Sequence, residues 1–267
     1  AAAGAAELRV APGGSIADAV RRAQASDTVV VERGYYAERL VIDKPLTLRG
    51  VNRPTLSGGG SGDVIRIQSP DVTVEGLIVR DSGKDLTAQN AGIYVEPGSH
   101  RTVIRHNDIT YTLFGLWIEK ANDVQVAGNL ITGLRDVQSA QRGNGIQLYN
   151  TRGARITDNN IGFTRDGIYV DVSHNAVFRG NRMHHLRYGT HYMNSYHNLW
   201  EGNESYLNRS GLALMEVRNQ EVRNNIAWGN SDHGIMLRTI QDSVIEGNIV
   251  AGNERGFFIY DAEYNTL

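Results

Sequence analysis

The chain has 267 residues, of which 40% are apolar and 7% aromatic, and its formal net charge is -2. Such a balance leaves no basic surface of the kind that binds nucleic acid, so we expect no nucleic-acid partner. The absence of Cys excludes disulfides and thiolate metal ligands, and no apolar run approaches the roughly 18 residues of a membrane helix. We therefore expect no direct membrane span.

The predicted elements begin with a featureless segment, AAAGAA, at the N-terminus. We expect residues 1–7 to be flexible, and they fit either the end left by signal-peptide cleavage or a simple tail. Ser15 and Asp18 then have the spacing of a capping box, followed by apolar residues at helical intervals. This pattern predicts a short helix over residues 15–24 that covers the open end of the fold. The first strands are expected near residues 29–31, 40–42 and 46–48.

An internal repeat of about 22 residues organises the rest of the chain. Each repeat has a Gly that opens a short alternating apolar run, and successive glycines are 22 or 23 residues apart except for one interval of 30. These glycines are Gly92, Gly115, Gly145, Gly167, Gly189, Gly211, Gly234 and Gly256. The long interval indicates an insertion around Asp136 to Gly143. A unit this short cannot bury its apolar face alone, so the repeats must stack.

A second marker is an Asn fourteen residues after the Gly, as expected of stacked amides that hydrogen-bond along the axis of a solenoid. Its members are Asn129, Asn159, Asn181, Asn203, Asn225 and Asn248, with Asn107 displaced by one. The first, third and eleventh residues after the Gly are apolar and are predicted to point inward. Together these patterns predict an all-β, right-handed parallel β-helix of about ten coils, forming one domain over residues 1–267. Because the sequence stops inside another coil, we expect the natural protein to continue.

The second and fourth residues after each Gly are predicted to point outward. In that register Met193 and Met215 are direct neighbours on adjacent coils, about 4.8 Å apart in backbone, and Met236 lies diagonal to Met215. His191 shares the strand of Met193, and Ala213 leaves a notch between His191 and Met236. An exposed group of methionines on a polar solenoid implies either a docking surface for a partner or a site for a soft metal.

Thioether and imidazole ligands without thiolate are typical of a Cu(I) site. His233 borders the same group of side chains. The candidate metal ligands are therefore His191, Met193, Met215, Met236 and His233. Met183 is excluded, because other coils place Ile or Val at its position and we assign it to the core.

Three arginines, Arg165, Arg187 and Arg209, occupy one column just before the Gly. They have the chemistry to bind an anionic group. We expect instead that acidic neighbours such as Asp158 and Glu204 pair with them, as most surface charges in proteins are paired or solvated.

Several segments resemble NosD-type periplasmic copper-binding proteins. They are Leu186 to Met193 (LRYGTHYM), Ser210 to Met215 (SGLALM), Asp232 to Met236 (DHGIM) and Phe257 to Tyr260 (FFIY), with further likeness at residues 43–50 and 142–146. The H-Y-M and A-L-M strings are fairly specific, whereas the Gly and Asn spacing is shared by many β-helix proteins. The resemblance covers essentially the whole chain.

This resemblance implies an exported, periplasmic and non-catalytic protein that handles copper for the maturation of nitrous oxide reductase. It also implies two further partners, a membrane ABC transporter and a copper-carrier lipoprotein. Carried onto matching positions, it favours His191, Met193 and Met215 as ligands, followed by Met236 and His233. Met236 departs from the family pattern, because an aliphatic residue is expected there.

Two other functions remain open. Parallel β-helices often act as polysaccharide lyases, hydrolases or epimerases, and Glu96, Glu119, Asp171, Tyr149 and Tyr169 could line a sugar groove. However, the sequence has neither a D-P-H-D string nor a dense acidic cluster. A passive adhesin or scaffold would use the methionines only for docking.

Overall fold

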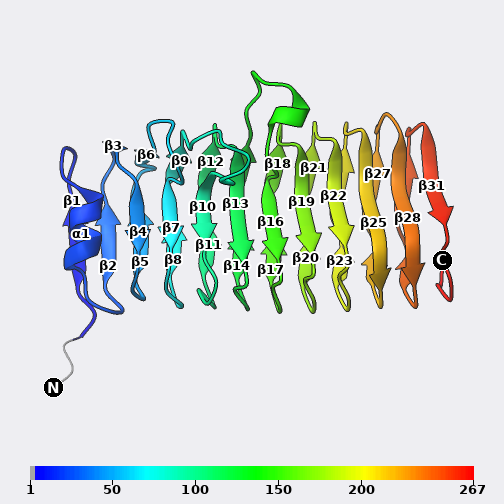
Figure 1. The fold of residues 1–267 in the computed structure, drawn as a ribbon, viewed down its shortest axis with the longest axis horizontal. Coiled ribbons are helices and arrows are strands. Elements are labelled where there is room, and N and C mark those ends of the chain that lie inside the picture. The colour runs from blue at the N-terminus through cyan, green and yellow to red at the C-terminus, as the bar shows by residue number, and fades with distance from the viewer. Residues whose placement is uncertain (1–3) are drawn as a thin grey trace.

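The computed structural model describes residues 4–267, which wind into a solenoid with one strand of each full coil on each of three faces (Figure 1). All strand pairs are parallel, and they form sheets of 11, 10 and 10 strands, here called sheets A, B and C. The predicted all-β parallel β-helix is confirmed. The stack has about 12 turns, whereas the sequence predicts about ten. The predicted number is too low because the first coils lack the Gly by which coils are counted.

The strands have the following bounds. Sheet A contains β1 (Glu7–Val10), β2 (Thr28–Val31), β5 (Thr47–Gly50), β8 (Thr73–Glu75), β11 (Val103–Arg105), β14 (Gln125–Ala127), β17 (Arg155–Thr157), β20 (Val177–Arg179), β23 (Leu199–Glu201), β26 (Glu221–Arg223) and β29 (Val244–Glu246). Sheet B contains β3 (Tyr35–Ala37), β6 (Thr55–Ser57), β9 (Ile78–Arg80), β12 (Asp108–Thr110), β15 (Leu130–Thr132), β18 (Asn160–Gly162), β21 (Arg182–His184), β24 (Glu204–Tyr206), β27 (Ile226–Trp228) and β30 (Ile249–Ala251). Sheet C contains β4 (Leu40–Ile42), β7 (Ile65–Ile67), β10 (Ala91–Val95), β13 (Phe114–Glu119), β16 (Ile146–Tyr149), β19 (Asp166–Asp171), β22 (Tyr188–Met193), β25 (Ser210–Arg218), β28 (His233–Gln241) and β31 (Arg255–Tyr260).

The predicted N-terminal helix is present as α1 (Ile16–Arg22), which packs against β1, β2 and β4 at the end of the stack. The Ser15 hydroxyl accepts a hydrogen bond from the Asp18 backbone N–H at 3.1 Å, as the capping-box pattern predicts. The Glu38 carboxylate accepts two more first-turn N–H groups, which the sequence did not indicate. Of the segment predicted to be flexible, residues 1–3 lie outside the described residues. The prediction is wrong at Glu7, because Glu7 begins β1 and pairs with β2.

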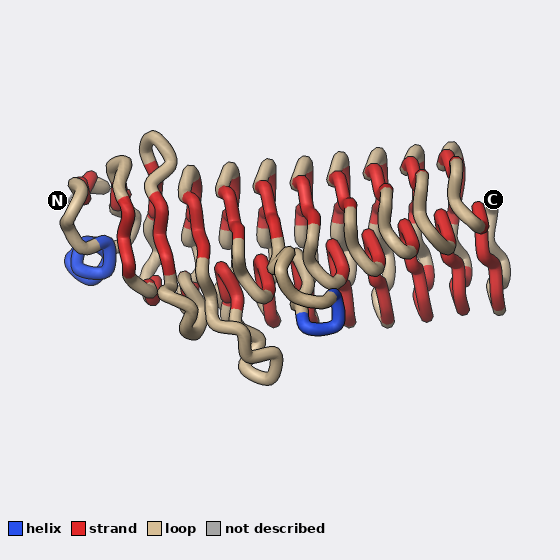
Figure 2. Tube along the Cα trace, turned by 90° about the horizontal axis from the view of Figure 1, so that it is seen from above, coloured by secondary structure: helices blue, strands red, loops and turns tan. Residues whose placement is uncertain are grey.

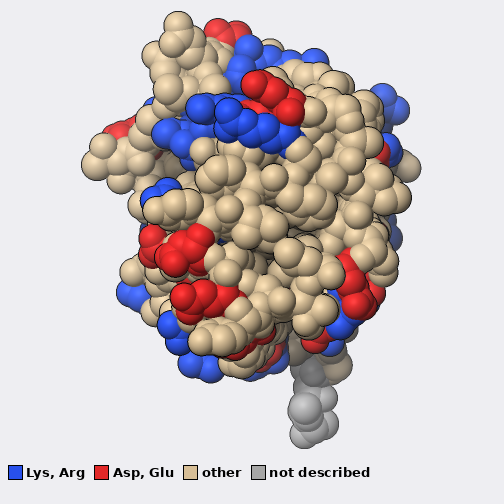
Figure 3. All heavy atoms as spheres, turned by 90° about the vertical axis from the view of Figure 1, so that its right-hand side faces the viewer, with Lys and Arg blue, Asp and Glu red and all other residues tan. Residues whose placement is uncertain are grey.

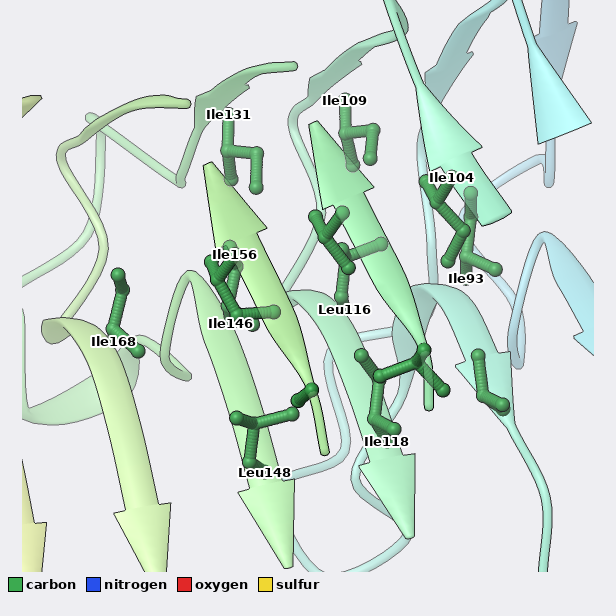
Figure 4. Packing of buried hydrophobic residues seen from close by; sticks show 14 of the residues in the cluster. Ile93, Ile104, Ile109, Leu116, Ile118, Ile131, Ile146, Leu148, Ile156 and Ile168 are labelled. Atoms are coloured by element: carbon green, nitrogen blue, oxygen red, sulfur yellow. The ribbon is translucent and has the colours of Figure 1, made fainter. Parts of the chain in front are cut away.

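The core is a set of aliphatic columns that run along the solenoid axis. Figure 4 shows one part of it, where Ile146 and Leu148 lie beside Leu116 and Ile118 of the preceding coil. As predicted, the first and third residues after the Gly are buried in the coils from Gly92 to Gly234, and the eleventh in the coils from Gly115 to Gly234. In the last strand Phe257 and Ile259 are exposed, because no further coil covers them within the described residues. Sheet B supplies a further inward column, and Met183 lies in it with no exposed surface, which confirms its assignment to the core.

The predicted Asn ladder is continuous along the inside of one turn. The Asn181 side-chain amide donates hydrogen bonds to Oδ1 of Asn203 at 3.0 Å and to the Ile156 carbonyl at 2.8 Å. Its own Oδ1 accepts the backbone N–H of Asn159 at 3.1 Å. Asn107 is a full member despite its displaced position. Each amide therefore joins two coils and satisfies backbone groups that the turn leaves unpaired.

A second amide ladder, not predicted from the sequence, follows the sheet B strands. It joins Asn208, Asn230 and Asn253. The Asn208 amide also donates to the Met183 carbonyl at 3.1 Å, so this ladder closes the next corner of the coil. The signal was present in the sequence as a second Asn at the same 22- to 23-residue spacing.

At the Gly column the backbones of successive coils leave no room for a Cβ. A Cβ added at Gly145 would lie 2.6 Å from the Gly167 carbonyl oxygen, and one at Gly189 would lie 2.7 Å from that of Gly211. Real Cβ atoms do not approach a backbone oxygen this closely. A side chain at these two positions would press on the backbone of the next coil, which explains the repeated Gly of the regular coils; in the coil before Gly92, the equivalent position is occupied by the buried Val64.

The insertion predicted around residues 136–143 projects from the stack beside sheet C (Figures 1 and 2). It contains one 3-10 turn, η1 (Ser139–Gln141). Leu134 packs with Leu113 and Phe114 in a small apolar cluster outside the main core, with Val137 against it. The insertion is thus anchored on the outside of the solenoid.

The ladder predicts a cost for removing one amide. We expect Asn181→Ala to lower the free energy of unfolding by about 1–3 kcal/mol, because it leaves buried donors and acceptors of two neighbouring coils unpaired. Urea denaturation followed by circular dichroism measures this. The exposed Gln125, replaced by Ala, serves as the control and should change stability by less than about 0.5 kcal/mol. Equal midpoints for the two variants would contradict a structural role for the ladder.

Candidate metal centre

Three neighbouring strands of sheet C, β22, β25 and β28, bring the candidate ligands together. Met193 is in direct register with Met215, and His191 is in register with Ala213. Ala213 in turn pairs with Met236. The three methionines are half-buried and outward-facing, whereas the intervening Leu212 and Leu214 are buried in the core. The relative placement of these side chains is the one that the Gly register predicted.

His191 is held by a buried carboxylate that the sequence analysis missed. Its Nδ1 lies 3.1 Å from Oδ2 of Asp166, a residue with no exposed surface. Asp166 also accepts hydrogen bonds from Arg187, at 2.8 Å from Nε and 2.6 Å from Nη2. Burial opposes its ionisation, but the bonds from Arg187 and His191 outweigh this and hold the pKa of Asp166 below its ordinary value.

An ionised Asp166 can only accept, and its 3.1 Å contact with Nδ1 is shorter than the 3.3 Å contact of Arg187 Nη2 with the same nitrogen, so we assign the His191 proton to Nδ1. The other ring nitrogen, Nε2, then carries a lone pair that is free to coordinate a metal. Metal-binding histidines commonly have such a carboxylate on the second nitrogen, since it fixes the ring orientation and raises the basicity of the ligand. His191 is therefore preorganised as a donor.

Two tyrosines form walls around His191. The Tyr169 ring centre is 4.7 Å from that of His191, and Tyr188 lies 5.2 Å away on the same strand as His191. The Tyr169 hydroxyl is also 3.8 Å from the Met193 sulfur. Burial raises the pKa of Tyr169, so the phenol stays protonated at neutral pH. These walls leave His191 with only 13% of its side chain exposed, in a sheltered position.

The structure does not bring His233 into this group. Its ring packs against Phe258 of the next coil at 4.9 Å, and its Nε2 faces Arg255 Nη1 at 3.4 Å. Its Nδ1 lies 3.2 Å from Asp232 Oδ1 but without hydrogen-bond geometry. Asp166 and His191 are 25 residues apart, as are His233 and Phe258. In both pairs, the residue directly before a Gly contacts an outward residue of the next coil. This spacing in the sequence would have predicted the contact between Asp166 and His191.

His191 and the methionines offer imidazole and thioether donors, and the carboxylate of Asp171 lies beside Met193 on the neighbouring strand. Over residues 4–267, no group of three or more His, Cys, Asp or Glu side chains is placed to hold a metal ion. The donors that lie together on the β22–β25 surface are the imidazole of His191 and the thioethers of Met193 and Met215. That donor set fits a soft cation and not a hard one such as calcium or magnesium.

A polar groove of about 330 Å³ adjoins the methionine pair on the N-terminal side. Its walls include Glu119, Tyr149, Tyr169 and Asp171, four of the residues expected of a sugar groove. The fifth, Glu96, is not among the lining residues and is hydrogen-bonded to Gln68 and Arg66. Asp171 is in register with Met193, so the groove and the methionine pair are continuous.

Comparison with known proteins identifies sequence relatives over most of the chain. The family model described as periplasmic copper-binding protein (NosD) matches residues 127–267. A probable ABC transporter binding protein NosD of Stutzerimonas stutzeri is 34% identical over an alignment of 249 residues, and the match covers 88% of this chain and 57% of the relative. A protein of the same name from Pseudomonas aeruginosa is 42% identical over 134 residues, 50% of this chain and 31% of the relative. The matched part of the chain thus spans about a third of the length of one relative and somewhat over half of the length of the other.

Solved structures share the solenoid at low sequence identity. The Dettilon tailspike protein (gp208) superposes with a TM-score of 0.66 at 16% identity, covering 86% of this chain and 62% of the tailspike chain. Pectate lyase Pel9A gives a TM-score of 0.64 at 12% identity, covering 96% of this chain and 78% of the lyase. At such identities the likeness shows the fold alone.

Over the part of the chain that the structure describes, none of the helices has the length and apolarity needed to cross a bilayer. The matched family model covers more than half of the chain, and it includes the strands that carry Met193, Met215 and Met236. Taken with the identity to the relatives, this shows that the chain belongs to the NosD family of periplasmic copper-binding proteins.

Proposed function

We propose that this chain binds copper as Cu(I) in the periplasm through His191, Met193 and Met215, and passes it on without catalysing a reaction. The observation that carries the proposal is the pairing of two outward thioethers beside an imidazole whose Nδ1 is held by Asp166. Thioethers select Cu(I), and a half-exposed site permits release by ligand exchange. The family described as periplasmic and copper-binding supports the same conclusion.

Met236 and His233 take secondary places in this proposal. Met236 offers a third sulfur one strand beyond Ala213, whose small side chain leaves room between Met236 and His191. His233 lies still further along, against Phe258, and we place it outside the first ligand set. Copper bound at the paired methionines therefore has a further thioether within the same face.

The destination we propose for the copper is nitrous oxide reductase, during its maturation. In this scheme the chain works with a membrane ABC transporter and receives copper from a lipoprotein carrier. The names of the relatives, which describe binding proteins of an ABC transporter, support the first of these partnerships.

Replacing both paired sulfurs tests the copper site. We expect Met193→Leu with Met215→Leu to weaken Cu(I) binding by more than about tenfold, since even the loss of an outer-shell partner of a ligand costs about 10–100-fold. Anaerobic competition with a chromophoric Cu(I) chelator measures this, and X-ray absorption reports sulfur against nitrogen neighbours. The copper content of nitrous oxide reductase matured with the variant is the cellular measurement.

Met183→Leu is the matched control for the sulfur replacement. It removes one thioether from the core and leaves the outer face unchanged, so Cu(I) affinity should equal that of the unmodified chain. Undiminished copper binding and reductase maturation in the double variant would refute the site.

A second variant tests the role of the buried carboxylate. Asp166→Asn removes the charge that holds the His191 proton on Nδ1, and its amide can turn an N–H toward the ring. We expect Cu(I) affinity to fall by about 10–100-fold and the nitrogen contribution in X-ray absorption to decrease. Asp71→Asn, which removes another arginine-paired carboxylate remote from this face, should leave both unchanged. Unaltered affinity and nitrogen coordination in the Asp166 variant would contradict the role of Asp166 in orienting His191 as a ligand.

One observation favours a different function. The groove lined by Glu119, Tyr149, Tyr169 and Asp171 has the carboxylates and aromatic walls of a sugar site, and enzymes such as pectate lyase share the fold. We expect no turnover of polygalacturonate or alginate by the chain, measured by unsaturated products and by reducing ends. Turnover that is lost in Glu119→Gln and retained in Glu96→Gln would establish the enzymatic alternative.

A further inference from the structure

The arginine column before the Gly does not have the partners that were expected of it. Glu204 lies on β24, in register with Arg182 of β21, and accepts its Nε at 3.0 Å. Neither Glu204 nor Asp158 forms an ion pair with the column within the described residues. The expectation is wrong for Arg165 and Arg209 and holds for Arg187, whose partner is another acidic neighbour, Asp166. Glu204 is engaged by its register neighbour Arg182, and the column lies at the corner between sheets B and C.

Only one member of the column is neutralised. Arg187 pairs with the buried Asp166, as described for the candidate metal centre. Within residues 4–267, no carboxylate oxygen lies within 4.0 Å of the guanidinium nitrogens of Arg165 or Arg209. Arg165 Nε is moreover buried and has no hydrogen-bond partner. A buried donor on a permanent cation is costly to leave unpaired, so this atom indicates a missing acceptor.

The insertion completes a groove over these arginines. Arg142, just after η1, donates hydrogen bonds to the carbonyls of Val137 at 3.0 Å and Arg135 at 3.3 Å, which fix its guanidinium beside the column. The groove has a volume of about 440 Å³ and is lined by Ser139, Ala140, Arg142, Arg165, His185, Leu186, Arg187 and Arg209. In the end-on view of Figure 3, Lys and Arg side chains gather along the upper edge, on the side where Figure 1 places the insertion.

The charge of this groove is strongly positive in a chain that is close to neutral overall. Four guanidinium groups line it, and Asp166 balances only one of them. Adjacent coils are about 4.8 Å apart in backbone, so Arg165 and Arg209 lie on either side of Arg187 at about twice that spacing. Their long side chains can converge on one acceptor group placed between them. Arginine forks bind phosphate and carboxylate with short, charge-assisted hydrogen bonds.

We propose that this groove is an oxyanion-binding site in which Arg165, Arg209 and Arg142 hold a phosphate, sulfate or carboxylate group. The bound oxygen supplies the acceptor that Arg165 Nε lacks. The leucine and alanine in the lining leave room for the rest of an organic ligand that bears such a group. The site is separate from the proposed copper ligands and does not depend on copper binding, although Arg187 borders the groove and also holds Asp166.

Isothermal titration of the metal-free chain with inorganic phosphate at low ionic strength tests the site, with succinate as a second probe for carboxylates. We expect saturable binding of at least one probe, weakened about tenfold or more in Arg165→Gln with Arg209→Gln, since each arginine contributes charge-assisted hydrogen bonds. Chloride at equal ionic strength gives the nonspecific background. Binding of phosphate alone, or of succinate alone, would identify which kind of group the site accepts.

Arg179→Gln is the matched control, because Arg179 is an exposed arginine paired with Glu201 on sheet A, away from the groove. It should bind the probes as the unmodified chain does. If the double variant does not fold, as judged by circular dichroism, the exposed Arg209→Gln alone should still reduce affinity measurably. Binding that is equal in the unmodified chain and in Arg209→Gln, or no binding of either probe above the chloride background, would overturn the proposal.

Discussion

Close stacking of the coils at the Gly column is the constraint on which the rest of this structure depends. With no side chain between them, one coil's backbone touches the carbonyl of the next, and Gly145 and Gly167 show how little space remains. This contact fixes the register, so that a residue lies directly over its equivalent 22 or 23 positions away. The Asn ladders, the aliphatic columns and the Met193–Met215 pair are all consequences of that single register. A solenoid of this kind presents its surface chemistry as columns, and two like residues in one column become neighbours without any long-range folding requirement.

The buried Asp166 connects two surfaces that would otherwise be independent. Its carboxylate accepts from His191 on the candidate metal face and from Arg187 at the edge of the arginine groove. An uncompensated carboxylate with no exposed surface would be strongly unfavourable, so both partners are needed to keep it ionised there. The carboxylate that orients His191 thus also fixes Arg187 at the edge of the arginine groove. The same chain segment, β19 to β22, carries the tyrosine walls that shelter the imidazole.

Much of the fold and part of the site could be predicted because they follow from periodicity. The repeat established the coil length, and alternation after each Gly established which residues face inward; this is why Met183 was assigned to the core and Met193 and Met215 to the surface. Contacts that cross a corner were missed. The pairs Asp166 with His191 and His233 with Phe258 join a residue before the Gly to one on the next coil, and the path of the turn decides whether they meet. The expected pairing of Glu204 with the arginine column was wrong for the same reason. Glu204 pairs with its register neighbour Arg182, whereas the column arginines lie at a corner and do not follow strand register.

The amino-acid sequence by itself therefore determined the stacking period, the inward and outward faces of each strand, and the alignment of the two methionines. These properties are local and repeat along the chain, so they can be read from the sequence of each coil independently. Only the tertiary structure decided that a buried carboxylate orients His191, that His233 turns away toward Phe258, and that the insertion covers the arginine column. Those features depend on which of several neighbours at similar distances a half-buried corner side chain contacts. Burial and charge pairing determine that contact, and both arise only when the coils are stacked.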